Sequence, residues 1–339
     1  MATIRVDIVS AEGAIWAGDA NLVIAPARMG DVGIAPRHAP LMTTLRPGDL
    51  RVQRDGQEEL YDGELHFTDK QIGRLLDELV RRGHEVTAAI WDDEKVDWRA
   101  FDVAVLRSPW DYHHRRDDFL AWAGWAAMKT QLHNPLALVR WNTHKAYLHE
   151  LETKGASVVP TEITLAGSRL DVAARMAKNG WARAVVKPAV GADSFGTVLA
   201  APDTMAAAQA HADDMLRERD LMLQPYLRSV EEPGERCLVH IDGRYSHAVR
   251  KRSHFLGGRH VGPEGLAVEA AEDERAEATR VLRLAGAADA LYARVDLARD
   301  DAGRPCLMEL ELVEPTLFFA VESAAAGRMA AALEARMRS

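Results

Sequence analysis

Cysteine is scarce in this chain. Only Cys237 and Cys306 occur among 339 residues. They lie far apart in apolar, strand-like surroundings, which argues against a disulfide framework and against a zinc site. A reducing compartment suits this composition, so we expect a cytoplasmic protein.

Positive charge and long apolar runs are also lacking. The 42 Lys and Arg residues are outnumbered by 51 Asp and Glu residues, giving a formal net charge of −9. This balance argues against a general nucleic-acid binder and favours a small ligand, although a local basic pocket is compatible with it. No stretch approaches the length of a spanning helix, and the N-terminus lacks a basic segment followed by an apolar run, so we expect neither membrane insertion nor export.

The residues that are present describe an ordinary globular chain with two kinds of organisation. The composition is 47% hydrophobic and 27% charged, and the length allows two or three domains. Up to about residue 60, short alternating runs cut by glycine and proline predict an all-β segment. Helices and strands then alternate, which predicts an α/β (α+β) fold after a partial β segment. The predicted segments are 1–65, 66–157, 158–230 and 231–339.

Periodicity and turn residues predict the elements that follow the β segment. The predicted strands are 85–91, 101–106, 184–187, 221–224, 235–241 and 245–249. The predicted helices cover about 70–83, 117–128, 143–154, 203–218, 272–285 and 322–337.

The stretch from Leu291 to Pro315 carries the strongest chemical signal. Tyr292, Arg294 and Asp296 alternate with apolar residues, a turn follows, and Glu309 and Glu311 then alternate with apolar residues again. A hairpin would therefore present three carboxylates together. Clustered carboxylates repel unless a cation lies among them, and hard oxygen ligands suit Mg²⁺. A solvated polar strand face is the alternative.

Lys187 ends a predicted strand and precedes a loop with Gly191, Gly196 and the hydroxyl residues Ser194 and Thr197. Glycines let backbone N–H groups approach phosphate oxygens, and a lysine adds a point charge. The order of residues differs from a Walker loop. An ordinary hairpin turn is the alternative.

Two further predicted strands end in residues that could contact a nucleotide. Three cations in a row, Arg250 to Arg252, are usually a solvated strand edge. If the strand faces a nucleotide, alternation sends Arg250 and Arg252 to one side, where a triphosphate would need them. The strand at 221–224 breaks at Gln224 and Pro225, which leaves backbone groups available for an adenine edge. An edge strand ending at a proline is the alternative.

Taken in order, these blocks resemble the ATP-grasp ligases over roughly residues 70 to 335. Four sequence blocks are similar to those of the cyclo-ligase group of D-cycloserine biosynthesis: LRSPWDYHHR (106–115), NPLALVRWNTHK (134–145), YSHAVRKR (245–252) and MELELVEPTLF (308–318). The resemblance implies a ligase that uses ATP and Mg²⁺ on a small amino-acid-like substrate. It implies an acyl phosphate formed on the substrate carboxylate and attacked by a nitrogen. It leaves the subunit number open, with a homodimer as one candidate.

The resemblance also assigns roles to individual residues. Lys145 and Lys187 match the lysines that embrace the nucleotide phosphates, and the loop from Gly191 to Thr197 matches the one that closes over them. The matches for adenine are Gln224, Tyr226 and Leu227, with Glu235 for the ribose. Arg250 matches the basic residue on the transferred phosphate. The metal ligands of the superfamily match Asp296, Glu309 and Glu311. Many members of the superfamily have Asn at the position of Glu311.

Substrate contacts are expected at the carboxyl end of the strand at 101–106, where open α/β sheets bind ligands. The candidates are Arg107, Ser108, Trp110, Asp111 and Tyr112, together with Arg294. Simple packing of Trp110 and Tyr112 beneath the closing loop is the alternative.

Residues 1 to about 60 resemble a different family. The stretches DIVSAEGAIWAGDA (7–20) and GDVGIAPRHAPLMTTLRPGDLRV (30–52) are similar to the N-terminal β-sandwich of the ATP synthase ε subunit. Three readings stay open: a natural fusion with a docking module, a misjoined gene product, or a ligase whose first strand comes from Arg51 to Phe67, with Glu64 to Thr68 as the candidate. The alternative function is an ε-like stalk or docking protein with an inactive ligase part. We favour the enzyme, because the clustered carboxylates lie in the larger part.

Overall fold

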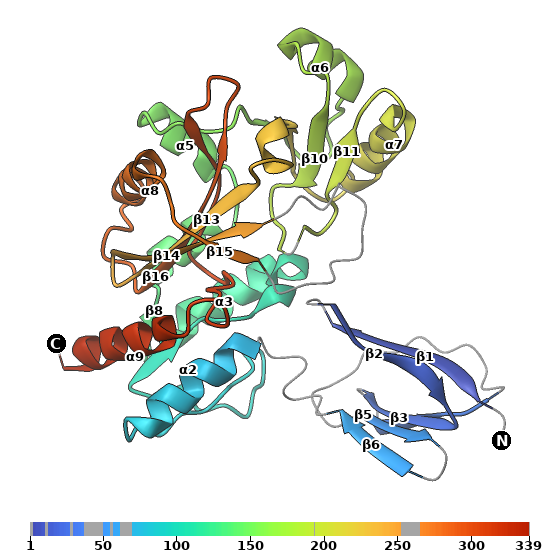
Figure 1. Cartoon of the computed structure of the whole chain (residues 1–339), viewed down its shortest axis with the longest axis vertical. Helices are drawn as coiled ribbons and strands as arrows, with labels where there is room; N and C mark the ends of the chain where they lie inside the picture. Colours follow the sequence, from blue (N-terminus) through green and yellow to red (C-terminus); the bar gives the residue numbers. More distant parts are fainter. Residues whose placement is uncertain are drawn as a thin grey trace. The chain divides into compact units, whose positions relative to one another are not determined.

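The computed structural model describes residues 3–10, 13–27, 30–36, 50–54, 57–61, 70–192, 194–251 and 265–338. The chain divides into two compact units, residues 1–76 and 77–339 (Figure 1). Helix α2 (Lys70–Arg81) crosses this division. Within the described part of the chain, the helices are too short or too polar to cross a lipid bilayer.

The first unit contains the predicted all-β segment. Strands β1 (Ile4–Ser10) and β2 (Gly13–Ala20) form an antiparallel pair. A four-stranded antiparallel sheet has the order β4-β3-β5-β6, from β3 (Leu22–Ala27), β4 (Gly30–Ile34), β5 (Leu50–Arg54) and β6 (Gln57–Tyr61). Its buried core is small and aliphatic, comprising Ala20, Val23, Ala25 and Val52. The candidate strand at Glu64 to Thr68 lies outside the described residues.

The second unit is built around three sheets (Figure 1). The first is a parallel pair, β7 (Val103–Val105) and β8 (Gln131–His133), accompanied by α3 (Arg116–Ala126). The second is four-stranded in the order β11-β10-β12-β9, from β9 (Glu162–Thr164), β10 (Ala184–Pro188), β11 (Val198–Ala200) and β12 (Leu221–Pro225). Helices α6 (Val172–Asn179) and α7 (Met205–Met215) pack on it.

The third sheet is five-stranded in the order β15-β14-β13-β16-β17. Its strands are β13 (Glu235–Ile241), β14 (Arg244–Lys251), β15 (Leu266–Val268), β16 (Tyr292–Arg299) and β17 (Pro305–Glu311). The helices of this region are α8 (Glu272–Leu284), α9 (Ala324–Met337), α4 (Leu136–Asn142) and α5 (Tyr147–Thr153).

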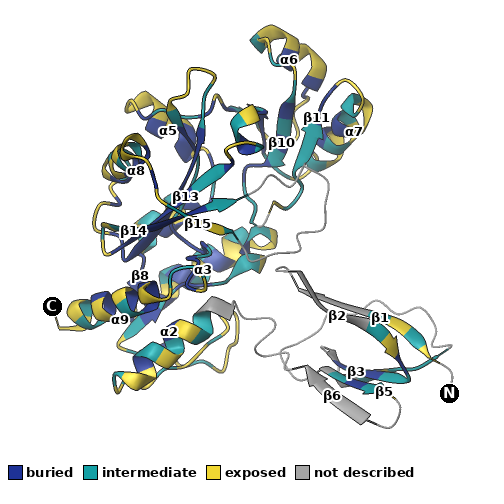
Figure 2. Cartoon of the chain, viewed as in Figure 1, coloured by how far each residue is buried: buried dark blue, intermediate teal, exposed yellow. Residues whose placement is uncertain are grey.

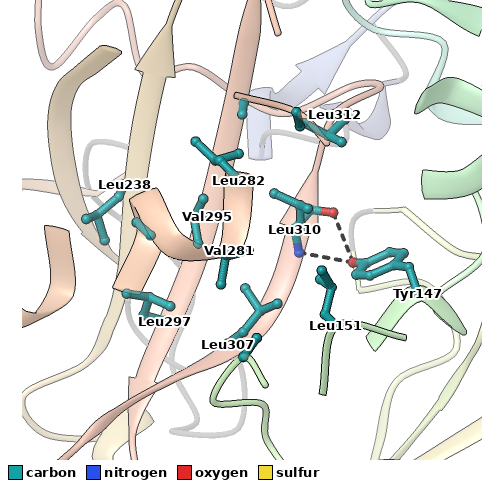
Figure 3. Packing of buried hydrophobic residues seen from close by; sticks show 14 of the residues in the cluster. Tyr147, Leu151, Leu238, Val281, Leu282, Val295, Leu297, Leu307, Leu310 and Leu312 are labelled. Atoms are coloured by element: carbon teal, nitrogen blue, oxygen red, sulfur yellow. Dashed lines mark hydrogen bonds between the residues drawn. The ribbon is translucent and has the colours of Figure 1, made fainter. Parts of the chain in front are cut away.

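One face of this sheet forms the largest core of the unit. Leu238, Val295 and Leu297 project toward Val281 and Leu282 of α8, as Figure 3 shows. Along β16 and β17 the apolar residues that build this core alternate with Arg294, Asp296, Glu309 and Glu311, whose side chains therefore lie on the other face of the sheet. Burial is therefore continuous through the centre of the sheet (Figure 2).

Side chains cover the outer edge of β17. The Tyr147 hydroxyl accepts from Leu310 N at 3.0 Å and donates to Leu310 O at 2.9 Å (Figure 3). Asn142 bonds Leu310 O and Leu312 N, both at 2.8 Å. An edge strand would otherwise leave these groups without partners. These bonds also tie the connection between α4 and α5 to the strand that carries Glu309 and Glu311.

Most predicted elements are confirmed, with two clear errors. The predicted strand at 85–91 is wrong: it pairs with no other strand among the described residues, and extended backbone without a neighbour forms no ladder. The predicted helix at 143–154 is shorter and begins at Tyr147, because the residues before it form the turn that carries Lys145. Helix α6 and the short strands β8, β9, β11 and β15 were not predicted.

Candidate functional site

The polar face of the β16–β17 hairpin gathers the three predicted metal ligands. Asp296 stands opposite Glu309, and Arg294 stands opposite Glu311, in the antiparallel register. Their apolar neighbours Val295 and Leu310 point into the core. The predicted hairpin and its shared polar face are therefore present. Oxygen ligands from adjacent strands are suited to a hard divalent cation.

Two lysines from distant segments meet at Glu309. Lys145 Nζ lies 2.8 Å from Glu309 Oε1, and Lys187 Nζ lies 3.9 Å from Glu309 Oε2. Lys145 follows α4, whereas Lys187 lies near the end of β10. Burial opposes the charge on Glu309, but Lys145 and Lys187 outweigh it and hold the pKa of this carboxyl below its ordinary value. The two predicted phosphate-binding lysines are thus brought together beside a predicted metal ligand.

Arg294 lies between the other two carboxylates. Its guanidinium donates to Asp296 Oδ1 and Oδ2, each at 2.8 Å, and also to Glu311. Burial disfavours the ionised form of Asp296, yet Arg294 and Lys251 keep its pKa below the ordinary value. The same burial, with Glu309 and Asp296 nearby, raises the pKa of Glu311 to about 6 despite Arg294. The ionisation of Asp296 and Glu311 therefore depends on the cations beside them, Arg294 and Lys251.

The register places Lys251, and not Arg250, on the carboxylate face. Lys251 pairs with Glu235, which is two residues from Cys237, and Cys237 pairs with Asp296. Burial opposes the charge on Lys251, but Cys237, Asp296 and Glu235 raise its pKa. A shift of one residue along a strand reverses the face, so Lys251 joins the cluster.

Arg250 occupies the other face of the same sheet. It pairs with Arg236, which pairs with Leu297 of the apolar core. Its guanidinium lies 3.9 Å from Glu232. The structure therefore does not bring Arg250 to the three carboxylates, and Arg252 lies outside the described residues.

The predicted ribose residue Glu235 does lie at the cluster. One ligand atom each from Glu235, Cys237 and Asp296 falls within 4.8 Å of the others. Burial raises the pKa of Glu235, with Asp296 adding to the effect and Lys251 opposing it. The Cys237 thiol lies 3.5 Å from Glu235 Oε1.

Two of the predicted adenine residues belong to an apolar cluster that both of the larger sheets contribute to. Tyr226 and Leu227 belong to a cluster that also contains Val185 of β10 and Met308 of β17. Gln224 pairs with Val185, so it shares the face that carries Lys187. Its amide donates to Thr161 Oγ1 at 2.8 Å, and the Tyr226 ring stacks on Arg183 at 4.2 Å.

The glycine loop reaches back toward Lys145. Lys145 Nζ donates to Gly191 O at 2.8 Å. Ser194 and Gly196 have positive φ angles of 56° and 62°, a backbone conformation that tight turns require. Thr197 N donates to Ser194 O at 3.1 Å, which closes the turn. The loop and the lysine pair therefore border the same space.

The predicted substrate segment, residues 107–112, is hydrogen-bonded to the residues that follow β17. Arg107 Nη2 donates to Pro315 O at 2.8 Å, and Trp110 Nε1 donates to Glu314 O at 3.2 Å. Tyr112 is buried beside Phe119, with ring centroids 5.1 Å apart. Tyr112 therefore packs in a buried cluster, and burial together with the nearby Glu314 carboxylate raises the pKa of its phenol.

The other two predicted substrate residues, Ser108 and Asp111, point to different surroundings. Ser108 Oγ is buried and has no hydrogen-bond partner among the described residues. Asp111 is instead directed to the surface, where it accepts from Trp91 Nε1 and Arg115 Nη2, each at 3.0 Å. The structure thus does not bring Asp111 to the carboxylate cluster.

Comparison with known proteins decides the family. The chain is 36% identical over 268 residues to the cycloserine biosynthesis protein DcsG of Streptomyces lavendulae, covering 75% of this chain and 90% of that protein. The chain belongs to the DcsG family. A family model for the N-terminal domain of D-cycloserine synthetase DcsG matches residues 54–134.

Solved structures agree with the DcsG assignment. The crystal structure of D-cycloserine synthetase DcsG superimposes with a TM-score of 0.73 and 34% identity, covering 79% of this chain and 95% of that one. A structure of the ATP-grasp ligase PsnB with a precursor variant, Mg and ADP gives a TM-score of 0.58 at 17% identity, covering 79% of this chain and 96% of that one. The DcsG-like region thus has the ATP-grasp fold.

The N-terminal segment matches a second family. The model of the ATP synthase δ/ε chain β-sandwich domain covers residues 3–71. The ATP synthase ε chain of Halorhodospira halophila is 52% identical over 86 residues, which is 24% of this chain and 61% of that protein. The chain thus spans less than two thirds of this ε relative, and the two family models overlap at residues 54–71.

Two ionisable residues near the carboxylate cluster, Lys251 and Glu314, were not predicted from the sequence. Lys251 lies on the same sheet face as Glu235 because the two residues are paired across β13 and β14. The sequence does not give the register of this strand pair, so Lys251 could not be chosen over Arg250. Glu314 lies beyond the end of β17, where the alternation that identified Glu309 and Glu311 no longer applies.

Proposed function

We propose that this protein is an ATP-dependent ligase that activates the carboxylate of an amino-acid-like substrate as an acyl phosphate. The observation that carries the proposal is the convergence of Lys145, Lys187 and Arg294 on Asp296, Glu309 and Glu311. Such an arrangement provides oxygen ligands for Mg²⁺ and positive charge for phosphates in one place. Membership of the DcsG family supports the same chemistry.

In this proposal, Asp296, Glu309 and Glu311 would hold Mg²⁺. The donor set fits, because all three are carboxylates on one sheet face and each already contacts a cationic group. Bound Mg²⁺ would neutralise phosphate charge and favour in-line phosphoryl transfer. Lys145 and Lys187 would bind phosphate oxygens, and backbone N–H groups near Gly191 and Gly196 would close over them.

The reaction then requires two steps. The substrate carboxylate oxygen attacks the γ-phosphorus, forming the acyl phosphate and releasing ADP. A nitrogen next attacks the carbonyl carbon, and inorganic phosphate leaves as the C–N bond forms. The chain contributes mainly alignment and charge neutralisation. The name of DcsG extends the proposal to ring closure, with D-cycloserine or a close relative as product.

Thermal unfolding with and without Mg²⁺ and ATP tests the proposal. At a ligand concentration of 100 times the dissociation constant, we expect stabilisation of about 2.7 kcal/mol. The shift should depend on the metal and should be smaller in Glu311→Gln, whereas the exposed control Glu94→Gln should match the wild type. Unchanged ADP formation in Glu311→Ala and Lys187→Ala would contradict the assignment.

A second candidate function concerns residues 3–71. Their match to the ε-chain β-sandwich supports a stalk or docking role, with the ligase part inactive. The same measurement distinguishes the two proposals. A metal-dependent shift with ATP that is lost in Glu311→Gln favours the ligase, and a complete absence of any shift favours the docking protein.

A further inference from the structure

Glu314 is a buried carboxylate that the proposed chemistry does not use. It lies three residues beyond Glu311, and only 9% of its surface is exposed. Its side chain lies within electrostatic range of Glu311, Lys145 and the Tyr112 hydroxyl. Glu314 therefore borders the carboxylate cluster but takes part in none of its ion pairs.

The surroundings of Glu314 are anchored by the predicted substrate segment. Trp110 Nε1 donates to Glu314 O, and Arg107 Nη2 donates to Pro315 O. Tyr112 of the same segment packs in one buried cluster with Val313, the residue before Glu314. The backbone on both sides of the Glu314 side chain is thus fixed by the segment 107–112, just beyond the end of β17.

Charge pairing distinguishes Glu314 from its neighbours. Glu309 is paired with Lys145 and Lys187, while Asp296 and Glu311 share Arg294. Among the described residues, no Lys or Arg forms an ion pair with Glu314. Burial first, and then Glu311, raises the pKa of Glu314 to about 8. A buried carboxylate without a cation is costly, and a carboxylate has roughly four acceptor positions to satisfy.

We propose that Glu314, together with Tyr112, forms the subsite that binds the ammonium group of the amino-acid-like substrate. This inference rests on the proposed ligase function and specifies how its substrate is read. An α-amino acid carries an ammonium group a few bonds from the carboxylate that is to be activated. The cations of the cluster would attract the carboxylate end, and Glu314 would receive the ammonium end as its missing partner.

The test uses two ligands that differ only in the amino group. D-cycloserine is the probe with the group, and 3-isoxazolidinone is the matched ring without it. Binding of each is measured calorimetrically to the full chain with Mg²⁺ and a non-hydrolysable ATP analogue. In Glu314→Gln, the dissociation constant for D-cycloserine should rise about tenfold or more, while that for 3-isoxazolidinone should change less than about twofold.

Two further variants keep the test decisive. Tyr112→Phe retains the carboxylate and should produce a smaller loss that is again selective for D-cycloserine. Asp111→Asn is the control, because this carboxylate is 52% exposed and is bound to Arg115 and Trp91. It should leave both dissociation constants unchanged.

The possible failures can be distinguished. Equal effects of Glu314→Gln on the two ligands, no effect on either, or no binding of D-cycloserine by a wild type that still binds the ATP analogue would overturn the subsite and leave the ligase standing. Failure of the wild type to bind the ATP analogue with Mg²⁺ would overturn the ligase and the subsite together.

Discussion

Asp296 and Glu309 stand opposite each other on β16 and β17, yet their charges are neutralised from different parts of the chain. Asp296 is held by Arg294 of its own strand, whereas Glu309 is held by Lys145 and Lys187 from two other segments. Glu309 therefore connects the turn after α4 and the four-stranded sheet to the five-stranded sheet. Its loss should affect both stability and function.

Glu309→Gln should lower the free energy of unfolding by about 3 kcal/mol. The substitution keeps the shape of the side chain but leaves two largely buried lysines without their carboxylate, and breaking a buried pair typically costs 3–5 kcal/mol. Urea denaturation without ligands measures the change. Glu94→Gln, at an exposed position, is the matched control and should lie within about 0.5 kcal/mol of wild type. A similarly small change in Glu309→Gln would show that these ion pairs contribute little.

Lys251→Met should weaken binding of an ATP analogue with Mg²⁺ by about tenfold or more, because a cation would be lost from the face that carries Asp296. Arg250→Met is the adjacent control and removes the same charge from the opposite face. Calorimetric titration of the two variants compares them directly. Weaker binding in Arg250→Met with normal binding in Lys251→Met would show that Arg250, and not Lys251, serves the phosphates.

The stability contribution of Glu314 should decrease as pH rises. Its pKa is about 8 in the folded protein against an ordinary value of 4.5, so the folded state binds the proton more tightly than the unfolded state. The contribution is therefore complete below pH 4.5 and is lost as pH rises toward 8. The difference in unfolding free energy between wild type and Glu314→Gln should fall by up to about 1.4 kcal/mol per pH unit in this window.

Urea denaturation of both proteins at pH 5, 6.5 and 8 provides the measurement. Taking the difference removes the titration of groups that the two proteins share. A difference that stays constant or grows with pH would mean that Glu314 is ionised in the folded state without a ligand.

Tyr147→Phe should destabilise the protein by about 1–3 kcal/mol, the cost of leaving one buried backbone group without a partner. The hydroxyl accepts from the Leu310 N–H, which loses this bond in the variant, whereas Leu310 O keeps the hydrogen bond from Asn142. Hydrogen exchange gives a local measurement, since the Leu310 amide should lose protection while the Leu312 amide, held by Asn142, keeps it. Equal loss at both amides would indicate opening of the whole edge instead.

Local pattern predicted much of this molecule. The alternation around Asp296, Glu309 and Glu311 predicted a hairpin with one polar face, and the structure contains it. The strand predicted at 85–91 failed for a physical reason: the residues have strand-like alternation, but a strand also needs a neighbour, which no single segment can supply. Helix α6 was missed because only eight residues carry its pattern.

The sequence by itself determined which residues could serve a nucleotide and a metal, because residue type and spacing place carboxylates, lysines and glycines on particular strands and loops. Only the tertiary structure decided which of them meet. Pairing between β13 and β14 selected Lys251 over Arg250, the side chains on the edge of β17 brought Lys145 to Glu309, and the segment 107–112 reached Glu314 from some two hundred residues away. Strand register and long-range contacts depend on the whole fold, which local periodicity does not encode.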